Sequence, residues 1–191
     1  MTVTQRRLVV AGLIAAGALA ASAAYYLSLV PATHPDHDHG ILNLDAGGRL
    51  LVQTRSGKPR NLVGAPGHVL VLHFFSTQAP GAAEELASLL AFQKTSAAAK
   101  DAELLLIAHD PDFATLDAWL AASHLEPASA DSFVLDPDGE TTRKLNSKRP
   151  LETMFFGADG KLSSQGRGVV DWGGGGAEAR IAQARAGSTI E

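Results

Sequence analysis

The residues with the clearest capacity for chemistry are three histidines near the N-terminus, His34, His37 and His39. They follow the pattern His-x-x-His-x-His, with Asp36 and Asp38 between them. Imidazole and carboxylate groups bind copper, zinc or nickel, and short histidine-rich tracts bind metal. A flexible tract implies no preformed coordination geometry and no supporting hydrogen bonds around the ligands. Two interpretations therefore stay open: a copper or zinc site, and a solvated linker that holds no metal.

Nucleophilic chemistry has few candidates in this chain. None of the 191 residues is a cysteine, so thiol exchange and thiol-dependent peroxide reduction lack their reactive group. Ser76 and Thr77 carry hydroxyl groups, but no serine–histidine–aspartate set is recognisable around them. His73 lies within an apolar run, which favours a histidine on a core strand over a catalytic one.

Composition excludes one class of partner. The formal net charge is −4 at pH 7, so the chain has no excess of basic residues with which to bind nucleic acid. Hydrophobic residues make up 46% of the chain, and a domain of about 150 residues is large enough to bury a core. We therefore expect a globular domain with no nucleic-acid partner.

An uncharged run over residues 8–30 is long enough to span a membrane. Arg6 and Arg7 precede it, and such a pair of cations places the N-terminus in the cytoplasm and the following domain across the membrane. Small residues at 21–23 are also typical of a signal-peptidase site, although the apolar run continues beyond them. We expect an uncleaved single-pass anchor, and cleavage is the alternative.

Beyond residue 41, buried-strand patterns alternate with helical ones. Alternating units of this kind predict an α/β domain with parallel strands, and a hairpin near the C-terminus adds an antiparallel pair. A first hairpin is predicted over residues 42–53, with its turn at Gly47-Gly48. The predicted strands are 69–75, 103–108, 132–135, 152–156 and 161–170, and the predicted helices are 80–94, 113–123, 140–145 and 177–186.

These patterns divide the chain into four parts. Residues 1–33 form a cytoplasmic stub and the transmembrane anchor, 34–41 a histidine-rich linker, 42–187 the α/β domain, and 188–191 a tail.

One segment at the end of the strand predicted over 69–75 resembles a redox motif. Residues 74–85 read Phe-Phe-Ser-Thr-Gln-Ala-Pro-Gly-Ala-Ala-Glu-Glu. This is similar to Phe-Trp-Ala-Thr-Trp-Cys-Pro-Pro-Cys-Arg-Glu-Glu of the membrane-anchored, thioredoxin-like (redoxin) proteins of the TlpA/ResA type. In that alignment the two cysteines of the family fall on Ala79 and Ala82, and an alanine methyl group cannot attack a disulfide.

Two further landmarks support the resemblance. Residues 150–156, Pro-Leu-Glu-Thr-Met-Phe-Phe, are similar to the family's cis-proline loop, and residues 168–172, Gly-Val-Val-Asp-Trp, are similar to the end of its last hairpin. Leu151 stands where the cis-proline belongs, and Pro150 comes one residue early, so we expect a trans bond before Leu151 and a reshaped loop. Related proteins often carry a carboxylate that assists proton transfer at the position of Glu152. Here Glu152 is either a buried acid near the former active site or a solvated loop residue, and we favour the second.

The resemblance implies a thioredoxin-like fold over residues 42–187, a central mixed β-sheet flanked by helices. It also implies a groove in which redox relatives hold an extended peptide by main-chain pairing. The residues that correspond to this groove are Thr77, Gln78, Pro80, Gly81, Pro150, Leu151, Glu152 and Thr153.

We favour a redox-inactive protein that is not an enzyme. It would be an accessory, binding or assembly subunit of a membrane complex, such as a respiratory complex. It would be a single-pass protein of the bacterial inner membrane with its domain in the periplasm. The first alternative is copper or zinc handling by the histidine tract, and no other cofactor is expected. The second is the family's thiol-disulfide oxidoreductase role in cytochrome maturation, which the missing cysteines disfavour.

Overall fold

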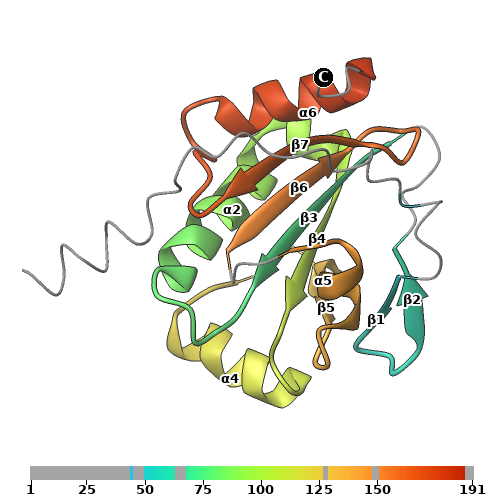
Figure 1. Cartoon of the computed structure of the whole chain (residues 1–191). Coiled ribbons are helices and arrows are strands. Elements are labelled where there is room, and N and C mark those ends of the chain that lie inside the picture. The colour runs from blue at the N-terminus through green and yellow to red at the C-terminus, as the bar shows by residue number, and fades with distance from the viewer. Residues whose placement is uncertain (1–43, 45–49, 63–67, 127–128, 148–150, 188–191) are drawn as a thin grey trace, which may run out of the picture. The chain divides into compact units, whose positions relative to one another are not determined.

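The computed structural model describes residues 44, 50–62, 68–126, 129–147 and 151–187 (Figure 1). The described residues belong to one compact unit, Gly40–Glu191. The predicted anchor, the histidine tract and the tail lie outside the described residues. Within those residues, no helix has both the length and the apolar character that a membrane span requires.

A mixed sheet of seven strands forms the centre of the domain, in the order β2-β1-β5-β4-β3-β6-β7. Strands β3, β4 and β5 run parallel, and the other neighbours pair antiparallel. The predicted parallel core and the antiparallel pair near the C-terminus are therefore confirmed. The strands are β1 (Leu51–Gln53), β2 (Pro59–Asn61), β3 (Val69–Phe75), β4 (Ala102–Ala108), β5 (Phe133–Leu135), β6 (Glu152–Phe156) and β7 (Leu162–Arg167).

Helices cover both faces of this sheet (Figure 1). They are α2 (Ala82–Thr95), α3 (Ala97–Lys100), α4 (Phe113–Ala122), α5 (Glu140–Lys144) and α6 (Gly176–Ala186), with one 3₁₀ turn, η1 (Ala130–Ser132). Successive side chains of a strand point to opposite faces, and the residues of β3 divide alternately between two hydrophobic clusters. The larger cluster joins the sheet to α2, α4 and α6, and the smaller one includes Leu145 at the end of α5.

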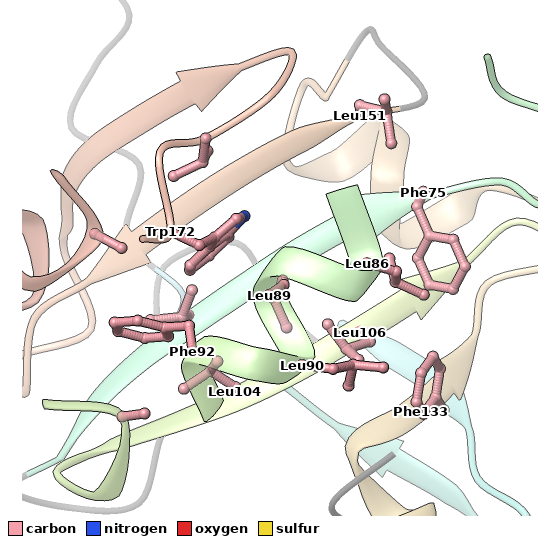
Figure 2. Close-up of a cluster of buried hydrophobic side chains, with 14 of the residues drawn as sticks. Phe75, Leu86, Leu89, Leu90, Phe92, Leu104, Leu106, Phe133, Leu151 and Trp172 are labelled. Carbon is pink, nitrogen blue, oxygen red and sulfur yellow. The ribbon is translucent and has the colours of Figure 1, made fainter. Parts of the chain in front are cut away.

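Helix α2 supplies much of the larger cluster. Leu86, Leu89 and Leu90 lie on its buried side, and Leu104 and Leu106 of β4 belong to the same cluster (Figure 2). The spacing of the leucines is helical, so a single face of α2 packs on the sheet. This packing fixes the start of α2 at the end of β3.

Two element boundaries differ from the predicted ones because glycines adopt left-handed backbone angles. Gly81 has a φ of 80° and precedes the first residue of α2, so the helix begins at Ala82 and its predicted start at Pro80 is wrong. Gly168 also has a φ of 80°, and β7 ends at Arg167 instead of continuing to Val170.

The first hairpin has its turn later than the sequence predicts. Strands β1 and β2 pair antiparallel, with Gln53 opposite Pro59, and Gly57 lies in the turn that joins them. The N–H group of Gly57 donates to the carbonyl of Thr54 at 2.9 Å. The predicted turn at Gly47-Gly48 lies outside the described residues.

Asp136, which follows β5, caps the short helix α5. Its carboxylate accepts hydrogen bonds from the N–H of Thr141 at 3.2 Å, from the N–H of Thr142 at 2.8 Å and from Oγ1 of Thr142 at 2.6 Å. The carboxylate is buried, so these donors replace water as its hydrogen-bond partners. Asp136 therefore connects the end of the parallel sheet to α5.

We expect Asp136→Ala to lower the free energy of unfolding by about 2–3 kcal/mol, because it leaves buried donors of α5 without an acceptor. The control is Asp138→Ala, which removes an exposed acceptor that receives one bond, from the N–H of Glu140 at 3.2 Å. Chemical denaturation of both variants makes the comparison. Equal losses in the two variants would contradict the role of Asp136.

Candidate functional site

Four chain segments meet at one end of the sheet. Phe74 of β3 lies opposite Glu152 of β6, so the loop that follows β3 and Leu151, which precedes β6, lie at the same end. The segment after β7 joins them, because the N–H of Gly168 donates to the carbonyl of Leu151 at 2.9 Å. The parallel partner β4 ends there too, at Ala108 opposite Phe75. Ligands of open α/β sheets bind at such carboxyl ends of strands.

Ala79 and Ala82 lie at the start of α2. Ala82 is the first residue of the helix and is only 1% exposed, and its N–H donates to the carbonyl of Ala79 at 3.1 Å. Ala79 is half-buried and packs against the larger hydrophobic cluster. A thiol at a helix start is activated by the helix dipole. Here the same positions carry two methyl groups, one buried and one half-buried, and no nucleophile.

The loop after β3 is held by a buried carboxylate. Asp110, directly after β4, accepts hydrogen bonds from the N–H of Thr77 at 3.3 Å and from Oγ1 of Thr77. The N–H of His109 in addition donates to the carbonyl of Phe75 at 3.0 Å. Asp110 is a site residue that the sequence analysis missed. Its position after a buried strand and before Pro111 was the one available signal.

His109 belongs to a short chain of hydrogen bonds. Its Nε2 lies 2.8 Å from Oγ1 of Thr142, which donates its only proton to Asp136. The neutral ring therefore carries its proton on Nε2. Burial lowers the pKa of His109, and the negative charges of Asp136 and Asp110 partly oppose this shift. The imidazole is uncharged at neutral pH and connects β4 to α5.

Glu152 is not the solvated loop residue that the sequence predicts. Its side chain is 1% exposed, and it accepts hydrogen bonds from Oγ of Ser147 and Nε2 of Gln165. Nε of Arg167 lies 3.4 Å from the same carboxylate. The expectation is wrong because β6 pairs with β3 on one side and β7 on the other, so that its first residue is already inside the sheet.

Thr153 and His73 form a second internal pair. Oγ1 of Thr153 lies 2.9 Å from Nδ1 of His73, and both side chains are buried. Burial lowers the pKa of His73 to about 3, so the ring is neutral at any physiological pH. The prediction of a core-strand histidine is confirmed. The side chains of Glu152 and Thr153 are both engaged inside the fold, so neither faces a ligand.

Gln78, Pro80, Gly81 and Val169 are exposed at this end of the sheet. Val169 is 73% exposed, beside Gly168, whose N–H binds the carbonyl of Leu151. The sequence analysis did not select Val169, and nothing in a Gly-Val-Val segment distinguishes its exposed valine from its buried one. We call the following set the binding face: Gln78, Ala79, Pro80, Gly81, Leu151 and Val169. Pro150, and with it the bond before Leu151, lies outside the described residues.

The metal hypothesis stays a prediction, since His34, His37 and His39 lie outside the described residues. In the part of the chain that the structure describes, no group of three or more histidine, aspartate or glutamate side chains is placed to hold a metal ion.

Solved structures of other proteins are similar to this domain and show its fold. A Chlorobium tepidum protein named as a thiol:disulfide interchange protein DsbE has a TM-score of 0.60 at 18% identity, over 72% of this chain and 94% of its own. A secreted Mycobacterium tuberculosis disulfide oxidoreductase has a TM-score of 0.57 at 20% identity, over 72% and 98%. The domain has a thioredoxin-like fold.

StoA from Bacillus subtilis is similar as well, with a TM-score of 0.54 at 17% identity over 71% of this chain and 95% of its own. No family model and no curated protein matches the sequence. The predicted thioredoxin-like fold is confirmed, while likenesses at these identities carry no statement about activity.

We expect Asp110→Ala to release the loop after β3. Loss of the two bonds to Thr77 should cost about 1–3 kcal/mol in unfolding free energy and speed hydrogen exchange of the Thr77 amide. The control is Gln78→Ala, which truncates an exposed side chain of the same loop. Similar exchange rates for the Thr77 amide in both variants would argue against anchoring by Asp110.

Proposed function

We propose that this chain is a redox-inactive, thioredoxin-like binding or assembly module of the TlpA/ResA type, an accessory subunit of a membrane protein complex. The observation that carries the proposal is the pair Ala79 and Ala82 at the start of α2, in a chain without any cysteine. The similar solved proteins are named for disulfide chemistry that needs thiols at such a site. This chain shares their fold but has no cysteine thiols.

The binding face suits a polypeptide more than a small polar substrate. Ala79 is half-buried, Val169 is exposed, and Gly81 leaves room for a backbone to approach. The ordered loop, held by Asp110, reduces the entropy that binding would cost. An extended segment of a protein partner fits these features, with an apolar side chain set against Val169.

The proposed function includes a membrane anchor at the N-terminus. The uncharged run at residues 8–30, behind Arg6 and Arg7, supports a single anchor in a bacterial inner membrane with the domain on the periplasmic side. Anchoring confines the domain near membrane partners and so raises its effective concentration there.

A dithiol introduced at the start of α2 tests the assigned register. We expect the variant Ala79→Cys with Ala82→Cys to form a disulfide on oxidation, because the N–H of Ala82 bonds to the carbonyl of Ala79 and brings the two residues together. Thiol titration and mass spectrometry measure the product. Insulin reduction by the unmodified chain should not exceed that of buffer.

The matched control is Ala87→Cys with Ala91→Cys, on the exposed side of the same helix. Its Cβ atoms lie about 5–6 Å apart, further than the roughly 4 Å of a disulfide, so it should keep two free thiols. Two free thiols in the Ala79/Ala82 variant as well would count against the register. Turnover of insulin by the unmodified chain would contradict the redox-inactive role.

Partner capture tests the binding face directly. The full-length chain, purified from its own membranes in mild detergent, should retain one membrane complex at fixed stoichiometry, identified by mass spectrometry. Val169→Gln should weaken that association by about tenfold, because an apolar contact of the interface is replaced by a polar side chain.

The control for this variant is Leu51→Gln, since Leu51 is the other large hydrophobic side chain that is exposed among the described residues, at 45%. It lies in β1, and its substitution should leave the association unchanged. Recovery of the protein without a defined partner, or an equal effect of both substitutions, would contradict the proposal.

A further inference from the structure

Glu85 of α2 carries a buried carboxyl group. The proposed redox-inactive binding function assigns no role to this group. Its Oε1 accepts two hydrogen bonds, from Nε1 of Trp172 at 2.7 Å and from the N–H of Val170 at 3.1 Å. Its Oε2 is enclosed and has no hydrogen-bond partner. One carboxyl group therefore connects α2 to a segment more than eighty residues away in sequence.

Trp172, which donates to Oε1 of Glu85, lies among other aromatic rings. Trp172 packs against Phe92 of α2, with ring centroids 5.4 Å apart (Figure 2). Its ring centroid also lies 6.2 Å from that of His73. Nε2 of His73 is also enclosed and has no hydrogen-bond partner among the described residues. A protonated Glu85 needs an acceptor for its proton, whereas the role of Nε2 of His73 as donor or acceptor is set by the tautomer of the ring.

The segment that Glu85 holds carries the exposed large hydrophobic residue of the binding face, Val169. Gly168 is bound to Leu151 on one side, and Val170 is bound to Glu85 on the other. Val169 lies between these two attachment points. Its position beside Leu151 therefore depends on both bonds, and only the bond to Glu85 involves a group that titrates.

We propose that Glu85 is a positioning residue for the binding face, and that the protonated form of its carboxyl holds the segment of residues 168–172 in the place where Val169 meets a partner. This inference rests on the proposed function for its effect on a partner. Its structural part, the proton-dependent attachment of Trp172 to α2, can be measured with no partner present.

Ionisation disfavours the attached arrangement because a buried negative charge would then have an unpaired oxygen. Burial raises the pKa of Glu85, and the hydrogen bonds from Trp172 and Val170 oppose that shift. No ion pair involving Glu85 exists within the described residues. Hydration of the ionised carboxylate would require the segment of residues 168–172 to move away from α2.

Other titratable or charged side chains on the elements around Glu85 are engaged elsewhere or face solvent. They are His73 of β3, Glu152 of β6, Arg167 of β7, Asp171 of the segment after β7, Glu178 and Arg180 of α6, and Glu84 of α2 itself. Of these, His73 stays neutral because burial lowers its pKa to about 3. We therefore assign the expected pH transition at Trp172 to Glu85.

The sign of the effect follows from the raised pKa. The stability that Glu85 contributes is fully present below its unfolded-state pKa, near 4.5, and is lost as the pH rises through the higher folded-state value. Attachment of residues 168–172, and with it partner binding, should weaken over the same interval.

The experiment follows the indole N–H resonances of the full-length chain, labelled with ¹⁵N at tryptophan and held in mild detergent, between about pH 4 and about pH 9. Trp119→Phe assigns the two resonances. The Trp172 resonance should shift with a midpoint above 4.5, the ordinary value for glutamate. In Glu85→Gln, which keeps an acceptor oxygen but cannot ionise, this shift should disappear.

Glu84→Gln is the matched control, because Glu84 is the neighbouring, exposed carboxylate of α2. It should leave the Trp172 transition unchanged. Persistence of the transition in Glu85→Gln, or a Trp172 resonance that does not shift with pH in the unmodified chain, would overturn the inference.

A second measurement separates this inference from the proposed function. The captured partner should bind the unmodified chain more weakly above the Trp172 midpoint, and should bind Glu85→Gln equally well on both sides of it. A Trp172 transition with pH-independent partner binding would overturn the coupling. Failure to capture any partner would instead contradict the proposed function and leave the Trp172 result as the test of Glu85.

Discussion

The pairing of β3 on both sides is the constraint on which the rest of the domain depends. All seven residues of Val69–Phe75 are buried, and the strand bonds in parallel to β4 and antiparallel to β6. A shift of one residue would turn every side chain to the opposite face of the sheet, so burial on both faces fixes the register. That register brings the start of α2, Asp110 and Leu151 to one end of the sheet.

Buried polar side chains then fix the loops and helix contacts at this end of the sheet. Asp110 holds the loop after β3, and Glu85 connects α2 to Trp172. Glu152, the first residue of β6, bonds to Ser147 and to Gln165 of β7. Buried carboxyl groups are costly unless they find donors, and each of these finds at least two partners. Each such contact joins elements that are distant in sequence, so the end of the sheet is positioned by tertiary contacts more than by local propensity.

This division explains what the sequence could predict. The bounds of β3 and β6 agree with the predicted strands because long apolar or β-branched runs leave few alternatives. The start of α2 was misplaced because Pro80 favours a first helical turn, while Gly81 uses a backbone conformation that only the fold requires. Local pattern therefore predicts that an element exists more securely than where it begins.

The candidate site was less predictable than the fold for a related reason. Glu152 was expected in solvent, since an isolated carboxylate in a loop-like sequence is usually hydrated. Its actual environment depends on Gln165 and Arg167 of β7, which pairs beside it only in the folded sheet. Val169 and Val170 are identical in type, yet one is exposed and the other buried, and the N–H of the buried one donates to Glu85.

Without thiols the site has no reactive sulfur, but the fold does not depend on them. In this chain Ala82 is buried in the core and Ala79 packs against it, so the helix start is stabilised by apolar contact that needs no sulfur. The structure keeps the carboxyl groups that fix the surrounding loops. Those carboxyl groups position the loops whether or not a thiol is present. A surface that binds a partner requires such fixed positions.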